Sequence, residues 1–338
     1  MTKKEAKRDR RRRKILLAII MIMFTAVVLS ASTYAWFTAN RSVTVEKIDV
    51  TVSTSTGLQI SVDAANWKSV VTNADIIGAS WSGVANQLPT GTNVLAPVST
   101  IGEIDITDGA TKGFMKMFKG TIDSNTSGDN ILIAERSTEA KGTSGDFVAF
   151  DLFFQSTVAQ TVYLTSNSKV IAIGDSTGIE NAARVALIRA GDVPSGSTAA
   201  SAQAIKATTA SPKLLWEPNY DVHTPTGVAN ALNVYGKTVG QTGAAKMAYN
   251  GVKAPIAKAN AIELDSADTN YFGAVTTTGS LASGIPTNAY INAFDAAAGI
   301  TKVRVYMWIE GQDVDCEDHA SGGSLSYNLQ FSIDSSQS

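Results

Sequence analysis

The sequence is poor in the side chains that support disulfide, zinc and nucleotide chemistry. It has one cysteine, Cys316, and two histidines, His223 and His319. One cysteine cannot form a disulfide within the chain, so the fold must rely on a hydrophobic core, and Cys316 either pairs between chains or is a small buried side chain. Two distant histidines without an H-E-x-x-H segment do not fit a zinc peptidase, and neither a P-loop nor a dinucleotide fingerprint occurs.

Basic residues are scarce outside the N-terminus. The first fourteen positions hold nine of the 28 Lys and Arg residues but only two of the 30 Asp and Glu residues, so the rest of the chain is net acidic by about nine charges. Binding to phosphate backbones needs clustered Lys and Arg. We therefore expect no nucleic-acid partner, and we interpret the N-terminal arginines as a topology signal.

The N-terminus has the pattern of an export signal. Residues 15–40 contain no charged side chain, and residues 15–29 are apolar apart from Thr25, behind the basic segment. This order is typical of a secretory signal peptide. The small residues Ser32 and Ala35 allow cleavage after either position, and after Ala35 the mature chain would begin at Trp36.

Retention of the same segment as an anchor stays open. Residues 15–37 are about long enough to span the hydrocarbon core of a bilayer as a helix. The sequence thus predicts two parts: a signal peptide or membrane anchor at residues 1–35, and an extracellular domain at residues 36–338.

Short runs rich in Val, Ile, Thr, Phe and Tyr, separated by Gly, Ser, Asn and Asp, dominate the remainder and predict a β-rich domain. The apolar positions of the first run are Val43, Val45, Ile48, Val50 and Val52, with the alternation shifted by one at residues 46–47. Residues 58–62 then alternate cleanly. Together the two runs predict an antiparallel opening.

The strongest core signal is the aromatic and aliphatic stretch at residues 146–164, which predicts two central strands. Near the C-terminus, residues 303–309 and 325–333 predict a closing hairpin with a long loop. Residues 179–186 fit a short helix, although residues 184–190 fit a strand equally well.

Two stretches near residues 191–212 and 224–299 are rich in small side chains. This composition predicts surface loops or lightly packed insertions in the domain. The sequence contains neither a tandem repeat nor a βαβ alternation.

The sharpest enzymatic hint is the G-x-S-x-G segment at residues 174–178, which matches a nucleophile elbow. A serine hydrolase built on it would use Ser176 as nucleophile and His223 or His319 as base. Because Gly, Ser, Thr and Asp are abundant here and no doubly wound sheet is predicted, a turn explains the segment better. We therefore predict no enzyme and no catalytic residue.

An acidic cluster near the C-terminus could supply oxygen ligands for calcium, the one cofactor we consider. Its members are Glu310, Asp313, Asp315, Glu317 and Asp318. The cluster lacks the glycine and the spacing of an EF-hand loop, which favours a solvated acidic loop over a metal site.

Residues 32–40, which read STYAWFTAN, resemble the signal-peptide junction of the TasA/camelysin family of exported biofilm-matrix fibre proteins. Residues 145–164 and 324–333 are similar to an aromatic strand and a closing strand of that family. The resemblance implies cleavage between Ala35 and Trp36 by a signal peptidase, a jelly-roll β-sandwich, and filaments in which the N-terminal strand completes a neighbour's sheet. The sequence has no metal-binding motif that would support the protease activity attributed to camelysins.

We therefore expect an all-β, antiparallel, jelly-roll-like β-sandwich with long loops or small insertions, behind an N-terminal signal or transmembrane helix. The expected function is non-enzymatic: a structural protein of a cell-surface or biofilm-matrix fibre, self-associating through an assembly strand at residues 36–52. Pairing of that strand within its own domain is the alternative. A membrane-anchored binding module or adhesin, held in the bilayer by residues 15–37, is the second functional candidate.

Overall fold

The computed structural model describes residues 43–52, 57–89, 94–107, 109–124, 130–208, 213–233, 235–258, 268–279, 290–317 and 322–334. The predicted signal segment and its cleavage site at Ala35 and Trp36 lie outside these ranges, as do Asp318 and His319. No helix in the described ranges has the length and apolar character needed to cross a bilayer.

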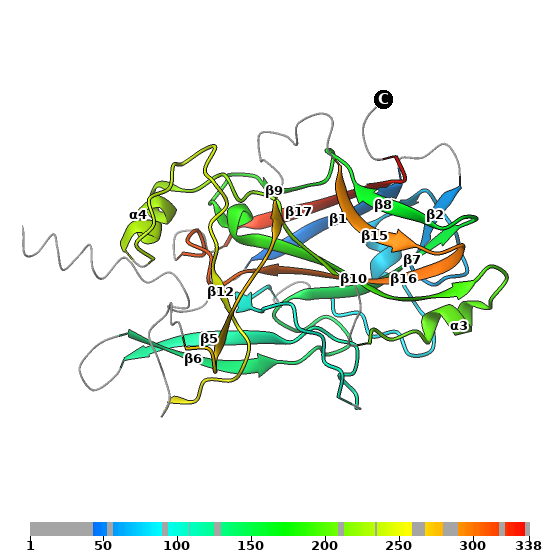
Figure 1. The fold of residues 1–338 in the computed structure, drawn as a ribbon, viewed down its shortest axis with the longest axis horizontal. Helices are drawn as coiled ribbons and strands as arrows, with labels where there is room; N and C mark the ends of the chain where they lie inside the picture. The colour runs from blue at the N-terminus through cyan, green and yellow to red at the C-terminus, as the bar shows by residue number, and fades with distance from the viewer. Residues whose placement is uncertain are drawn as a thin grey trace, which may run out of the picture.

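The chain is mostly β, and two six-stranded sheets form its centre (Figure 1). The strands of the first sheet, here called the front sheet, are β1 (Thr44–Val52), β3 (Val70–Val71), β8 (Gln160–Leu164), β9 (Lys169–Ile173), β15 (Ile291–Ala296) and β17 (Ser324–Ser332). Their order is β15-β8-β17-β1-β3, with β9 also paired to β17. β1 runs parallel to β17, and the other pairs are antiparallel.

The second sheet, the middle sheet, has the order β14-β11-β10-β16-β7-β2. Its strands are β2 (Leu58–Ser61), β7 (Val148–Ser156), β10 (Ala183–Pro194), β11 (Lys213–Glu217), β14 (Thr278–Gly279) and β16 (Gly299–Ile309). Only the β11–β14 pair is parallel. The long strands β7, β10 and β16 lie side by side at its centre.

Smaller elements surround these sheets. The remaining strands are β4 (Val98–Ser99), β5 (Met117–Ser124), β6 (Asn130–Ser137), β12 (Asn250–Val252) and β13 (Phe272–Ala274). The helices are α2 (Asn73–Ile77), the 3-10 helix η1 (Ile179–Ala182), α3 (Ala199–Gln203) and α4 (Pro225–Asn233). β4, β5 and β6 form a three-stranded sheet, and β12 pairs with β13.

The front and middle sheets pack face to face around the main hydrophobic core. Phe154 of β7 contacts Phe294 of β15 and Phe331 of β17, with ring centroids 4.9 and 5.0 Å apart. All three side chains are buried in one apolar cluster that draws on both sheets. Burial of such rings supplies much of the hydrophobic stabilisation of a domain.

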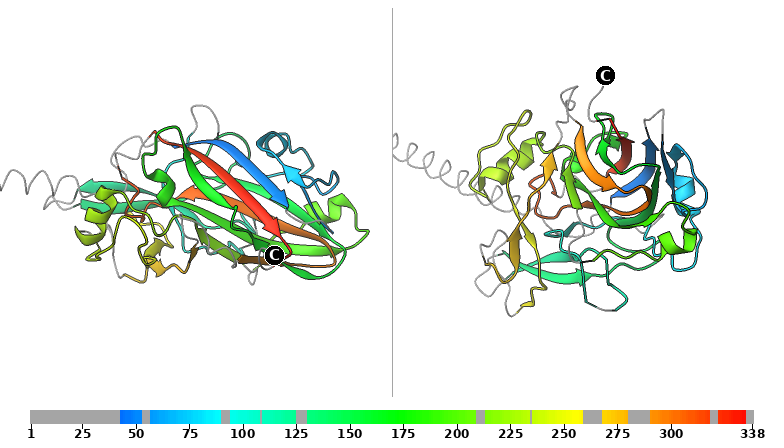
Figure 2. Two further views of the ribbon diagram at one scale, coloured as in Figure 1. Left: turned by 90° about the horizontal axis from the view of Figure 1, so that it is seen from above. Right: turned by 45° about the vertical axis from the view of Figure 1, so that its right-hand side comes forward.

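The other face of the middle sheet is covered too, so β16 is buried along its whole length. Tyr306 and Trp308 of β16 pack with Met115 and Met117 in a second apolar cluster. The Tyr306 hydroxyl also accepts a hydrogen bond of 2.9 Å from the Met115 backbone N–H. Both figures show β5 and β6 on this side of the middle sheet (Figures 1 and 2).

Several predicted elements are confirmed. The core stretch forms two strands, β7 and β8, and the alternation of β1 breaks at a bulge between Val45 and Lys47. The segment at residues 179–190 combines both expectations, because η1 leads directly into β10. The region at residues 191–212 contains the end of β10 and α3, and the region at 224–299 contains α4 and short strands besides β15.

The predicted strand pairings are wrong in two places. β1 and β2 lie in different sheets, and so do β16 and β17, so neither pair forms a hairpin. The purely antiparallel arrangement is also wrong, because β1–β17 and β11–β14 are parallel. Each of the two pairs of consecutive strands is divided between the front and middle sheets, and both strands of a pair bury apolar side chains in the shared core.

Candidate functional site

The predicted assembly strand, β1, lies within the front sheet between β17 and β3. Figure 2 shows β1 (blue) beside β17 (red) along most of its length. The pairing runs from Thr44 opposite Ser324 to Val52 opposite Phe331. In the single chain, β1 therefore completes the sheet of its own domain.

The apolar side chains of β1 point into the main core. Val43, Ile48 and Val50 are buried, and Val45 and Val52 are partly buried against the same cluster. These are the five positions that the alternating pattern identified. Full burial of each of the first three contributes about 1.5–3 kcal/mol relative to exposure.

The second edge of β1 is paired only near its two ends. Val43 exchanges two backbone hydrogen bonds with Leu95, of 3.1 and 2.8 Å, and Val50 and Thr51 pair with β3. Between these points, Thr44–Asp49 has no strand partner on that side among the described residues. An edge of this kind can accept or donate a strand through main-chain hydrogen bonds.

The acidic loop that follows β16 is buried, which contradicts the prediction of a solvated loop. Glu310, Asp313, Asp315 and Glu317 are each at most 8% exposed. Burial of this kind requires partners for each carboxylate, since an unpaired buried charge is costly.

Each of these carboxylates has a protein partner of its own. Glu310 accepts from the Trp308 indole at 3.0 Å, and Asp313 pairs with the buried guanidinium of Arg184. Glu317 accepts from the Thr224 hydroxyl at 2.9 Å. No group of three or more metal-binding side chains gathers among the described residues, which do not include Asp318. The described residues of the acidic cluster therefore do not form a ligand shell for calcium.

Asp315 is paired with one of the two histidines. The Nδ1 of His223 lies 2.7 Å from an Asp315 carboxylate oxygen, and the other oxygen accepts from the Thr224 backbone N–H at 2.7 Å. Burial opposes the charged imidazolium, but the hydrogen bond and charge of Asp315 outweigh it and raise the pKa of His223. The Nε2 of His223 is buried and has no hydrogen-bond partner in the described part of the chain.

The serine of the G-x-S-x-G segment is not joined to this pair. Ser176 is exposed in the turn after β9, and its Oγ bonds to the Glu180 carboxylate and accepts from the Gly178 N–H. No hydrogen bond links Ser176 to His223 among the described residues. The His223–Asp315 pair instead ties the acidic loop to the segment that precedes α4.

The sequence analysis did not predict the buried ion pairs of the middle sheet. Arg304 of β16 bonds to Asp151 of β7 at 2.8 Å and also to Glu139, and all three side chains are almost fully buried. The available signal was Asp151 within the aromatic and aliphatic stretch that predicted the central strands. A lone carboxylate there requires a cation from a neighbouring strand.

A scan against protein-family models found no matching family, and searches of curated proteins and of solved structures found no match to the chain. The resemblance at residues 32–40 therefore stays a prediction.

Proposed function

We propose that this chain is a non-enzymatic, exported structural protein of a cell-surface or biofilm-matrix fibre, in which β1 joins one subunit to the next. The observation that carries the proposal is the position of β1. It is the first described strand, its principal partner is β17 near the other end of the chain, and more than half of its second edge is open among the described residues.

The connectivity of β1 favours exchange between subunits. Residues 53–56 join β1 to β2, but β2 belongs to the middle sheet and does not pair with β1. No hairpin with the next strand holds β1 in place. A strand of this kind can leave its position and occupy the same position in a neighbour while the rest of the domain keeps its connections.

The energetics of exchange also fit a fibre. An exchanged β1 would place Val43, Ile48 and Val50 in the same contacts that it makes in its own domain. The exchanged and unexchanged forms therefore differ little in contact energy, whereas the open form loses those contacts and is disfavoured. Head-to-tail exchange that does not close on itself gives a filament.

We further propose that the front and middle sheets form a jelly-roll-like sandwich and that export ends with cleavage between Ala35 and Trp36. Cleavage would leave residues 36–42 ahead of Val43 as a free end of the assembly strand. N-terminal sequencing of protein from the culture supernatant tests this step, with a species that begins at Trp36 as the expected result.

A crosslinking experiment tests the exchange itself. Asp49 of β1 lies opposite Asn328 of β17 on the outward face of the front sheet. Asp49→Cys and Asn328→Cys are made in separate chains, both with Cys316→Ala, so that each chain has one thiol. The two chains are mixed, assembled and treated with a short thiol-reactive crosslinker.

Exchange predicts covalent dimers in the mixture and none from either chain alone. A matched pair, Asp49→Cys with the distant exposed Lys237→Cys, should give none. A chain carrying both Asp49→Cys and Asn328→Cys should crosslink internally before assembly and then stay monomeric. Filaments that form normally from the internally locked chain would overturn the proposal.

The second candidate is a membrane-anchored surface binding module. One observation favours it, a cavity of about 410 Å³ beside β16 that is lined by several cationic side chains. Recovery of the full-length chain from membranes, with residues 1–35 retained, would move this candidate ahead of the fibre.

A further inference from the structure

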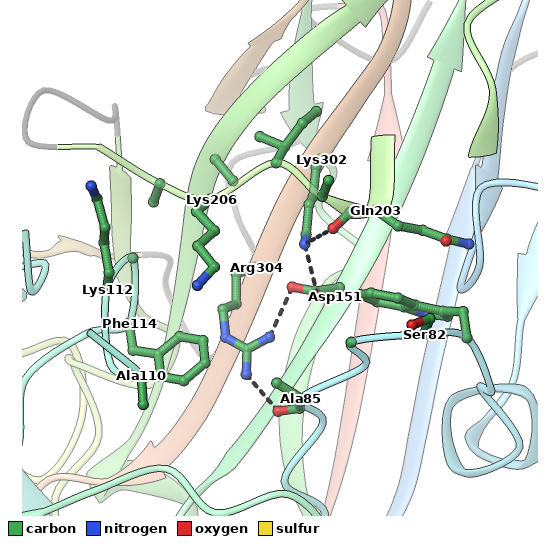
Figure 3. A pocket seen from close by; sticks show the side chains of 17 residues that line it. Ser82, Ala85, Ala110, Lys112, Phe114, Asp151, Gln203, Lys206, Lys302 and Arg304 are labelled. Atoms are coloured by element: carbon green, nitrogen blue, oxygen red, sulfur yellow. Dashed lines mark hydrogen bonds and ion pairs between the residues drawn. The ribbon is translucent and has the colours of Figure 1, made fainter. Parts of the chain in front are cut away.

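A cavity opens on the outer face of the middle sheet, on the side away from the front sheet. It has a volume of about 410 Å³ and lies over β16, between residues 81–85, residues 110–114 and residues 203–207 at the end of α3 and directly after it (Figure 3). This volume is within the range of about 300–1,000 Å³ that small-molecule sites occupy. Neither the assembly strand nor the acidic loop contributes to it.

The wall of the cavity carries an excess of positive charge. Lys112, Lys206, Lys302 and Arg304 line it, against the single carboxylate of Asp151. Lys302 and Arg304 both bond to that carboxylate, at 3.1 and 2.8 Å. Two cations thus share one anion, although Arg304 has Glu139 as a further partner.

The buried cations retain hydrogen-bond donors. The Lys302 ammonium donates to the Gln203 carbonyl and to Asp151, which uses two of its three N–H groups. Arg304 uses four of its five N–H groups, on Tyr306, Asp151, Ala85 and Glu139. One donor of each cation is left without a partner among the described residues.

Lys206 adds a third cation beside Lys302 and Arg304. Its side chain is exposed and extends toward Arg304, as Figure 3 shows, and it forms no ion pair among the described residues. Burial is the main cause that lowers the pKa of Lys302; the charge and hydrogen bond of Asp151 oppose this change, and the positive charges of Arg304 and Lys206 add to it. Arg304 and Lys206 thus disfavour the charge on Lys302, and an anion among the three cations would offset that effect.

Much of the remaining lining is apolar, with Ser82 and Gln203 as polar exceptions. Ala85, Ala110, Ala204, Ala207 and Ile205 supply small aliphatic surfaces. Two aromatic rings complete it: Phe114 lies under the Arg304 guanidinium at 4.7 Å, and Trp81 lies under the Lys302 ammonium at 5.3 Å. A sulfate or phosphate ion would leave this apolar part of the cavity unfilled.

We propose that the cavity binds a small organic carboxylate with a ring-shaped apolar body, its carboxylate between Lys206, Lys302 and Arg304 and its ring against Phe114 and the alanines. Charge-assisted hydrogen bonds to a carboxylate fix the orientation of such a ligand, and the apolar contacts supply affinity.

Titration calorimetry of the full chain with benzoate tests the proposal, with benzamide as the uncharged isostere and sulfate as the anion without a ring. We expect benzoate to bind at least about tenfold more tightly than either, because a hydrogen bond to a charged group contributes that much. Equal affinity for benzamide would overturn the role of charge, and equal affinity for sulfate would overturn the role of the ring. No binding at millimolar benzoate would overturn the site.

Three variants locate the binding. Lys206→Met should weaken benzoate binding about tenfold, whereas Lys169→Met, at an exposed lysine of β9 in the front sheet, should leave it unchanged. Ala204→Trp fills the cavity without a change of charge and should abolish binding. Since Lys206 and Ala204 are exposed, the variants should unfold at the wild-type temperature. Wild-type affinity in both Lys206→Met and Ala204→Trp would contradict the proposed site.

Discussion

Replacement of Glu310 by glutamine should change how the stability of the protein depends on pH. Glu310 lies at the end of β16 and is fully buried, where it accepts hydrogen bonds from the Trp308 indole at 3.0 Å and from the Gln312 backbone N–H at 3.2 Å. Burial raises the pKa of Glu310 from its ordinary value of 4.5 to about 7, although hydrogen bonds from Ser99 and Trp308 oppose the change.

The raised pKa of Glu310 makes the folded protein less stable as the pH rises, because the folded state binds a proton more tightly than the unfolded chain. Between pH 4.5 and 7 the folded protein holds a proton on Glu310 that the unfolded chain has released. Stability from this group is therefore present below pH 4.5 and is lost as the pH rises toward 7. At 1.36 kcal/mol for each pH unit, the loss amounts to about 3 kcal/mol.

Glutamine has the shape of the protonated acid but does not titrate. Glu310→Gln should gain about 3 kcal/mol in stability relative to wild type between pH 4.5 and pH 8, from a start about 1–3 kcal/mol below wild type, because its amide NH2 cannot accept the hydrogen bond that one carboxylate oxygen accepts. Urea unfolding measured over this pH range gives the difference between the two proteins, in which the contributions of other groups cancel.

An exposed glutamate provides the matched control. Glu135 of β6 faces solvent, and Glu135→Gln should follow the wild-type curve at every pH. If the free energies of unfolding of Glu310→Gln and wild type run parallel from pH 4.5 to 8, Glu310 is ionised in the folded protein at neutral pH, and the reasoning from burial fails.

Three further outcomes are expected. Phe154→Ala should lower the free energy of unfolding by about 3–5 kcal/mol in urea titrations. The control Val158→Ala, at a side chain 56% exposed, should change it little. Equal effects of the two substitutions would refute the assignment of Phe154 to the core. Val50→Asp should destabilise the domain or release β1, seen as faster proteolysis near residue 53, because it places a charge at a fully buried position of β1. Addition of calcium should leave the melting temperature unchanged, since each described acidic-loop carboxylate already has a protein partner. A rise of several degrees would instead support a calcium site in the acidic loop.

Local sequence pattern predicted strands far better than it predicted their partners. The apolar alternation from Val43 to Val52 locates β1 and even its bulge, because burial of every second side chain is a local property. The choice of β17 as partner depends on residues almost three hundred positions away. Nothing in either strand specifies a parallel arrangement, so the sequence favoured the commoner antiparallel hairpin.

Burial of charge was the second quantity that local pattern could not predict. The sequence predicts a solvated acidic loop after β16, because Asp and Glu are usually exposed. Its burial depends on Arg184, His223 and Thr224, which come from β10 and from the segment before α4. The alternation of Arg304, Tyr306 and Trp308 along β16 did contain a hint, since two aromatic residues on one face indicate that a further layer covers it.

The two proposed activities lie on different layers and should be separable. β1 belongs to the front sheet, whereas the cavity lies on the far side of the middle sheet, and no residue lines both. Lys206→Met should therefore assemble like wild type, and the chain locked by crosslinked Asp49→Cys and Asn328→Cys should bind benzoate like wild type. Loss of benzoate binding in the locked chain would mean that the sheets are coupled through the core around Phe154, and the cavity would then report on the state of β1.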